Sequence, residues 1–179
     1  MKIFESLDFN GAQCRQEFGE LRDWLNAHPT LGEKAIRDFF HHRRHLSAFI
    51  ASSSPNMNRL DRIAFEYPLF GDFACDLVVG DSAGRAFCFV EFEDAGPQSL
   101  FVRRGKKATR EWSPRFDHGY SQINDWFHAT TAASKDPGGL PPSSLLGPFL
   151  LGLKISLDND PLAAELVAFG RGQLLGIDR

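Results

Sequence analysis

The sequence predicts a mixed α/β fold in which helices flank a central sheet, and three observations support this prediction. The chain of 179 residues is long enough for one domain with a hydrophobic core. Its content of 42% hydrophobic and 12% aromatic residues suits a globular protein. Apolar side chains recur at helical spacing before residue 60, whereas apolar runs typical of strands follow it. We therefore expect residues 1–179 to form a single domain, with a helical part over 1–60 and the core over 61–179.

Two helices are expected in the N-terminal part. Asn10 has the short polar side chain that caps a helix, and it precedes the predicted helix Gly11–Ala27. Thr30 and Glu33 have the spacing of a capping box, which predicts a second helix that continues to about Ala51.

Strands are expected to follow these helices, and then helices and strands in alternation. The predicted strands cover Ile63–Pro68, Phe73–Val79, Ala86–Glu93, Phe149–Ile155 and Gln173–Ile177, and the predicted helices cover Asp117–Ala133 and Asp160–Phe169. The order ααβββαβαβ describes one mixed α/β domain without an internal repeat.

The apolar runs and the cysteines of the sequence predict where the protein is located in the cell. No apolar run approaches the roughly 20 residues that span a bilayer, and the N-terminus lacks the long apolar segment of a signal peptide. We expect a cytoplasmic protein with no membrane contact. The three cysteines, Cys14, Cys75 and Cys88, form no CxxC pair and are expected to be reduced core residues.

Three carboxylates stand at the ends of two predicted buried strands, in the stretch CDLVVGDSAGRAFCFVEFED. If the strands form a hairpin, any register that pairs an even with an odd residue number places Asp76 on the same face as Glu91 and Glu93. One such register sets Asp76 directly opposite Glu91. Carboxylates this close repel one another unless a cation lies among them, and oxygen ligands of this kind suit magnesium or manganese. The alternatives are an even register, or Glu93 and Asp94 in a solvated loop.

A basic segment follows the acidic strand end. Between Phe101 and Arg115 six basic residues stand against one acid, Glu111, so that the local charge is +5 although the whole chain carries −3. Such a segment contacts phosphates or is a solvated loop. The residues expected to bind nucleic acid are Arg103, Arg104, Lys106, Lys107, Arg110 and Arg115.

Three short motifs follow one another along the chain: Asp76, then Glu91-Phe92-Glu93 on the next strand, then Ser121–Trp126 on a later helix. Their order resembles the PD-(D/E)XK nuclease superfamily, and most closely the nuclease domain of the Shedu anti-phage defence proteins. The resemblance runs from about Phe39 to the C-terminus. It implies a restriction-endonuclease-like fold with its nuclease core over 61–179.

The resemblance also implies roles for individual residues. Asp76 and Glu91 match the ligands of a divalent metal, Mg²⁺ or Mn²⁺, and Gln122 matches a glutamine beside the active site. Glu93 stands where the superfamily normally has a lysine. As a carboxylate it can activate water or bind a second metal, and the missing positive charge can come from Lys106 or Lys107.

The expected function is metal-dependent hydrolysis of nucleic acid, with DNA as the expected partner and anti-phage defence as the expected setting. The alternative is a catalytically degenerate nuclease fold that binds nucleic acid or serves as an interaction module in a homo-oligomer. We expect Trp126, on the helix of Gln122, to be a core residue and not a base-stacking platform.

Overall fold

The computed structural model describes the backbone of residues 4–54, 57–69, 73–106, 109–133 and 145–151, and side chains as far as Trp126. The predicted helix Asp160–Phe169 and the predicted strand Gln173–Ile177 lie outside the described residues.

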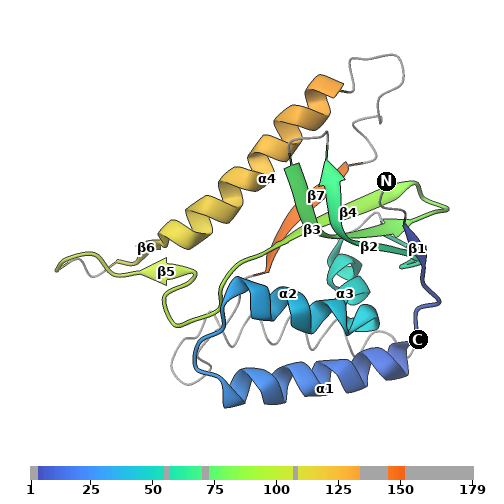
Figure 1. Ribbon diagram of the computed structural model, residues 1–179. Helices are drawn as coiled ribbons and strands as arrows, with labels where there is room; N and C mark the ends of the chain where they lie inside the picture. The colour runs from blue at the N-terminus through green and yellow to red at the C-terminus, as the bar shows by residue number, and fades with distance from the viewer. Residues whose placement is uncertain (1–3, 55–56, 70–72, 107–108, 134–144, 152–179) are drawn as a thin grey trace.

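A five-stranded sheet forms the centre of the molecule, in the order β1-β2-β3-β4-β7 (Figure 1). The strands are β1 Glu5–Ser6, β2 Arg62–Leu69, β3 Phe73–Asp81, β4 Ala86–Phe92 and β7 Leu145–Leu151. Neighbours from β1 to β4 are antiparallel, whereas β7 is parallel to β4. The predicted mixed sheet is thereby confirmed, and β7 begins earlier than the predicted strand Phe149–Ile155.

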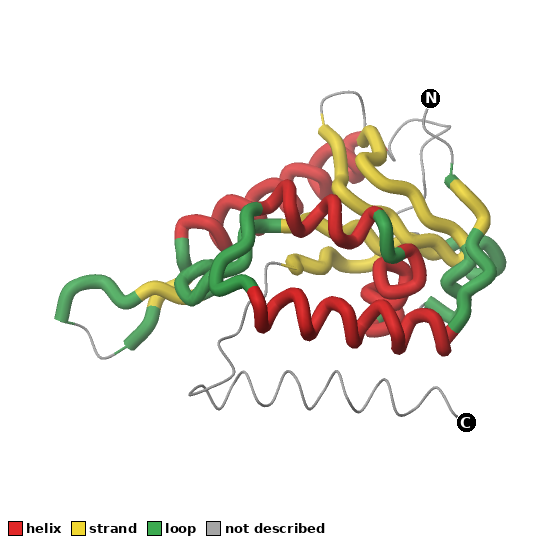
Figure 2. The backbone as a smooth tube through the Cα atoms, turned by 60° about the horizontal axis from the view of Figure 1, so that its bottom comes forward, coloured by secondary structure: helices red, strands yellow, loops and turns green. Residues whose placement is uncertain are grey.

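Helices cover both faces of this sheet (Figures 1 and 2). Below it in Figure 1 lie α1 Gly11–Ala27, α2 Glu33–His41, α3 Arg44–Phe49 and the short 3₁₀ helix η1 Ile50–Ser53, and on the other face lies α4 Pro114–Ala133. Each face has its own hydrophobic cluster. Phe39, Phe40 and Leu46 pack with Leu77 and Val90 on the first face. Ile123 and Trp126 pack with Cys75 and Val78 on the second, which confirms Trp126 as a core residue.

The cap of α1 is confirmed. Asn10 Oδ1 accepts hydrogen bonds from the amides of Ala12, at 2.9 Å, and Gln13, at 3.1 Å. All three cysteines are free and buried, also as predicted.

The prediction of a single helix up to Ala51 is wrong, because the helix is interrupted between the end of α2 at His41 and the start of α3 at Arg44. Glu17 of α1 is buried, and its Oε2 accepts the amide of Leu46 at 2.7 Å, an amide that a continuous helix would direct to His42. Ser47 Oγ donates to the carbonyl of Phe40 at 2.7 Å and secures the bend. A carboxylate from another helix thus caps α3.

The predicted capping box is also wrong. The residue before α2 is Gly32, which has no side chain to cap it. Leu31 instead forms an antiparallel bridge with Ala95, through paired backbone hydrogen bonds of 2.7 and 2.8 Å. The start of α2 is therefore fixed to the segment that follows β4.

The basic segment forms a hairpin that the sequence analysis did not assign. Its strands are β5 Phe101–Val102 and β6 Glu111–Trp112, which pair with each other and project from the body of the molecule (Figures 1 and 2). Helix α4 then begins at Pro114, three residues before the predicted start. Ser113 Oγ caps this helix by accepting the amide of Phe116 at 3.0 Å, and proline suits the first helical position.

None of the helices in the described ranges is both long enough and apolar enough to span a membrane. The restriction-endonuclease-like fold and the division of the chain into domains stay predictions.

Candidate functional site

The β3–β4 hairpin has the register that brings the strand-end acids together. Leu77 pairs with Val90 and Val78 with Phe89, so that odd residues of one strand face even residues of the other. The same register, continued by one position, sets Asp76 beside Glu91. The regular pairing stops at Leu77, and Asp76 Oδ2 accepts the amide of Phe92 at 2.8 Å.

Side-chain alternation along β3 is interrupted at Asp76. Cys75 and Val78 both belong to the cluster under α4, although strict alternation would send residues three apart to opposite faces. Across the sheet, Glu66 lies between the pairs Phe65–Leu77 and Tyr67–Cys75 and has a φ of 48°, which is rare for a residue with a side chain. The interruption leaves Asp76 directed towards α2.

Helix α2 supplies a cation to this carboxylate. Arg37 Nη1 lies 3.3 Å from Asp76 Oδ1 and 3.7 Å from Glu33 Oε1 on its own helix. The pKa of the Asp76 carboxyl is raised by burial, and this effect is opposed by the Phe92 amide and by Arg37.

Glu91 is the most strongly perturbed carboxyl of the group. It is 6% exposed, and its Oε2 is buried without a hydrogen-bond partner among the described residues. Burial is the largest cause that raises its pKa to about 8, followed by the charges of Asp76, Glu33 and Glu93, and the Asp76 amide opposes them. The negative charges of Asp76, Glu33 and Glu93 therefore disfavour ionisation of Glu91.

Helix α4 brings two further polar side chains to the end of β4. His118 Nδ1 lies 3.0 Å from Glu93 Oε1, and Gln122 follows His118 by one helical turn. Glu93 is 4% exposed, and its Oε2 and the Oε1 of Gln122 are buried without a partner in the part of the chain that the structure describes. Buried acceptors without donors are costly, and a cation or a bound donor would satisfy them.

Comparison with family models gives a match to "Shedu protein SduA, C-terminal" over residues 31–141. The match covers more than half of the chain. The chain belongs to the Shedu SduA C-terminal family. The matched residues of this Shedu-family chain include Asp76, Glu91 and Glu93, the basic hairpin and α4. Comparisons with curated proteins and with solved structures found no match. The PD-(D/E)XK assignment stays a prediction.

The arrangement of the acids fits a two-ligand site for a hard cation better than a dense metal cage. Within the described ranges, no group of three or more His, Cys, Asp or Glu side chains is placed to hold a metal ion. Asp76 and Glu91 supply carboxylate oxygens, and Mg²⁺ is commonly held by one or two carboxylates together with water and phosphate. The unpartnered Glu91 Oε2 leaves an acceptor for such an ion.

Three residues of this neighbourhood were missed by the sequence analysis, namely Glu33 and Arg37 on α2 and His118 on α4. Glu33 and Arg37 are four residues apart, a spacing that signals a helix-surface ion pair and nothing more. In the structure of this chain, Arg37 is the cation that contacts Asp76. Lys106, one of the two residues expected to supply a positive charge, is exposed on the hairpin, and Lys107 lies outside the described residues.

The predicted nucleic-acid-binding residues that the structure describes are spread along the projecting hairpin and the start of α4. Arg103, Arg104, Lys106 and Arg110 are exposed. Arg104 Nε lies 3.6 Å from Glu111 Oε2, and Arg115 Nε lies 3.6 Å from Asp94 Oδ2. Both ion pairs are partly exposed and therefore weak.

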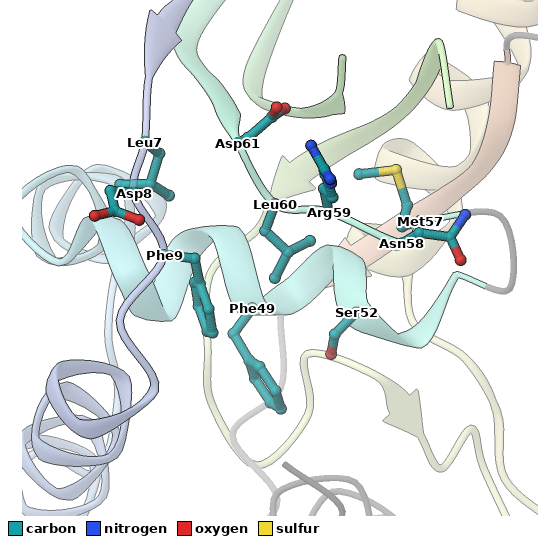
Figure 3. A pocket seen from close by; sticks show the side chains of 10 residues that line it. All are labelled: Leu7, Asp8, Phe9, Phe49, Ser52, Met57, Asn58, Arg59, Leu60 and Asp61. Atoms are coloured by element: carbon teal, nitrogen blue, oxygen red, sulfur yellow. The ribbon is translucent and has the colours of Figure 1, made fainter. Parts of the chain in front are cut away.

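A separate cavity of about 450 Å³ lies where the chain enters β2 (Figure 3). Leu7, Phe9, Phe49 and Leu60 line it together with polar residues, and none of the predicted site residues does. Asp61 on its rim already accepts the amide and the hydroxyl of Ser82. The cavity offers no converging set of acid–base groups.

Proposed function

We propose that this protein is a metal-dependent nuclease that hydrolyses phosphodiester bonds of DNA. One observation carries the proposal: the β3–β4 register, continued one position past its last pair Leu77–Val90, puts Asp76 opposite Glu91, and Glu91 keeps a buried oxygen without a partner among the described residues. Membership of the Shedu family supports a role in anti-phage defence.

Asp76 and Glu91 would hold Mg²⁺ or Mn²⁺. Such an ion supplies positive charge for the phosphate oxygens and favours the deprotonated form of water. Glu93 would accept the proton of the attacking water, and the ring of His118 at 3.0 Å orients and stabilises this carboxylate. Gln122 would orient the phosphate or the water. Arg37 would supply the charge that a lysine at position 93 would otherwise bring.

The second candidate function is nucleic-acid binding or assembly without hydrolysis, by a degenerate nuclease fold. The observation that favours it is Glu93 itself, because a carboxylate cannot neutralise charge that develops on a phosphate.

Incubation of the purified chain with supercoiled, nicked, linear and single-stranded DNA, in Mg²⁺, Mn²⁺ or a chelator, separates the two functions. We expect cleavage that needs the metal and that Glu91→Gln abolishes, because the substitution removes a ligand charge. Asp23→Asn is the matched control, since Asp23 is an exposed carboxylate on α1, and it should cleave like wild type. Cleavage that persists in Glu91→Gln would contradict the assignment of the site.

Substitutions at position 93 test the mechanism. If Glu93 accepts a proton, Glu93→Gln should lower the rate by about 10²-fold or more, the usual scale for a positioned acid or base. If the position merely tolerates glutamate, Glu93→Lys should raise the rate or create activity. Wild type, Glu93→Gln and Glu93→Lys that all bind DNA but never cleave it would establish the second function.

A further inference from the structure

Four aromatic rings form a continuous stack that runs from the basic hairpin onto α4. The ring centroids of Phe101 and Trp112 are 4.6 Å apart, and those of Trp112 and Phe116 are 4.2 Å apart. Phe116 and Tyr120 continue the series at 6.2 Å with nearly parallel planes, 8° apart. We call Phe101, Trp112, Phe116 and Tyr120 the aromatic row.

Two members of the aromatic row are unusually exposed. The exposed fraction is 49% for Trp112 and 54% for Tyr120, and among the described residues the one other exposed large hydrophobic side chain is Phe18, at 38% on α1. The side chains of Trp112 and Tyr120 therefore expose aromatic surface to solvent, one on β6 and the other on α4. Phe101 and Phe116 are half-buried and hold the row in place.

The aromatic row is separate from the acidic site. Phe116 and Tyr120 are four residues apart and lie on one flank of α4, and Trp112, on β6 just before the helix, stacks on Phe116. His118 and Gln122 are offset by two residues from Phe116 and Tyr120, which is more than half a turn of helix. The row thus lies on β5, β6 and the first turns of α4, where the projecting hairpin meets the helix (Figure 1).

The charge around the aromatic row is positive. Arg103 and Lys106 are exposed on the same hairpin, and basic residues outnumber the two acids, Glu111 and Asp117, between Phe101 and Tyr120. Rings inside the row cover one another's faces, so the exposed ring at its end, Tyr120, is the one on which an unpaired nucleobase can stack while phosphates contact the cations. A second copy of the chain fits less well, since a two-fold contact over this patch would bring like charges together.

We infer that the aromatic row is a stacking platform for the unpaired bases of single-stranded DNA. This inference names a substrate feature and rests in part on the proposed nucleic-acid function. It does not require hydrolysis, so the test is made in a chelator, where metal-dependent cleavage cannot occur. Loss of the cleavage activity proposed above would leave the outcome of this test unchanged.

The experiment compares two labelled strands of equal length and charge, oligo-dT and an abasic strand, by fluorescence anisotropy with the full chain. Wild type should bind oligo-dT roughly tenfold or more tightly than the abasic strand, on the scale of base–aromatic stacking. Tyr120→Ala should remove most of this preference, and Trp112→Ala, which removes the ring that Phe116 stacks on, should lower it; both should leave binding of the abasic strand intact. Trp112→Phe should keep the preference, because it keeps a ring.

Phe18→Ala is the matched control, because it removes an exposed ring outside the aromatic row, and it should keep the full preference. Equal binding of the two strands by wild type would overturn the inference. The inference would also be overturned by a Trp112→Ala variant that retains the preference but loses self-association in a sedimentation experiment. The partner of the row would then be a second copy of the chain. A thermal melt of each variant identifies any loss of affinity that comes from unfolding.

Discussion

Glu91 carries the clearest electrostatic signature of the protein at the level of single residues. Its carboxyl is buried beside other acids, which raises its pKa from an ordinary 4.5 to about 8. Between these values the folded protein binds a proton that the unfolded chain releases, so stability falls as the pH rises. The contribution is fully present below about pH 4.5 and is lost by about pH 8.

This linkage predicts the behaviour of Glu91→Gln in a chelator. The amide keeps the shape of the side chain and cannot ionise, so the melting temperature of the variant should fall less than that of wild type between pH 5 and pH 8. At pH 8 the variant should be the more stable protein. Thermal melts across this range measure the difference, with Asp23→Asn as the control that follows wild type. A wild-type protein that melts at a higher temperature than Glu91→Gln at pH 8 would contradict the raised pKa of Glu91.

At the level of helices, strands and turns, side chains that accept hydrogen bonds from backbone amides fix where an element begins or ends. In the β3–β4 turn, Asp81 is buried, and its carboxylate accepts the amides of Ala83 and Gly84 within the turn and those of Asn58 and Arg59 before β2. These hydrogen bonds lower the pKa of Asp81. One carboxylate therefore ties the turn to the entry of the neighbouring strand.

Substitution by alanine should have opposite effects on stability at Gly84, which lies close to the Asp81 carboxylate, and at Gly19, which has no atom near its Cβ position. A Cβ at Gly84 would lie 2.9 Å from Asp81 Oδ2, so Gly84→Ala should lower the free energy of unfolding by about 1 kcal/mol or more. A Cβ at Gly19, inside α1, meets no atom within 4 Å, and Gly19→Ala should raise it by about 0.5–1 kcal/mol. Urea unfolding of both variants measures the contrast. Equal stabilisation by both would show that the turn accommodates a side chain.

Charge is distributed unevenly over the whole molecule. The chain carries −3, yet the projecting hairpin gathers basic residues at one end, while the acids of the candidate site lie at the ends of β3 and β4. Positive charge that is presented apart from the acids can hold a phosphate backbone without sequence readout.

This asymmetry predicts salt-sensitive binding of duplex DNA through the hairpin. Arg103→Glu combined with Lys106→Glu should weaken binding to all sequences alike and reduce the slope of log affinity against log salt by roughly one unit for each lost phosphate contact. The control is Arg22→Glu with Lys34→Glu, which changes the net charge equally at exposed positions on α1 and α2. Titrations at several salt concentrations measure the slope. An equal loss in both double variants would mean that net charge alone matters.

The sequence by itself determined the features that depend on neighbours along the chain. The cap at Asn10, the strands β3 and β4 and the helical spacing of apolar residues in α2 follow from short-range spacing and side-chain chemistry. The sequence left the β3–β4 register open, and the structure has the odd–even one. A strand alternates with period two and a helix with period 3.6, so these patterns are legible without a structure.

Only the tertiary structure decided which distant groups meet. The buried Glu17 of α1 caps α3 through the amide of Leu46, 29 residues away, Arg37 reaches Asp76 across 39 residues, and His118 reaches Glu93 across 25. The interrupted alternation at Asp76 and the exposure of the aromatic row arise in the same way. They depend on how sheet and helices pack against one another, and no local period in the sequence encodes contacts between elements so far apart in the chain.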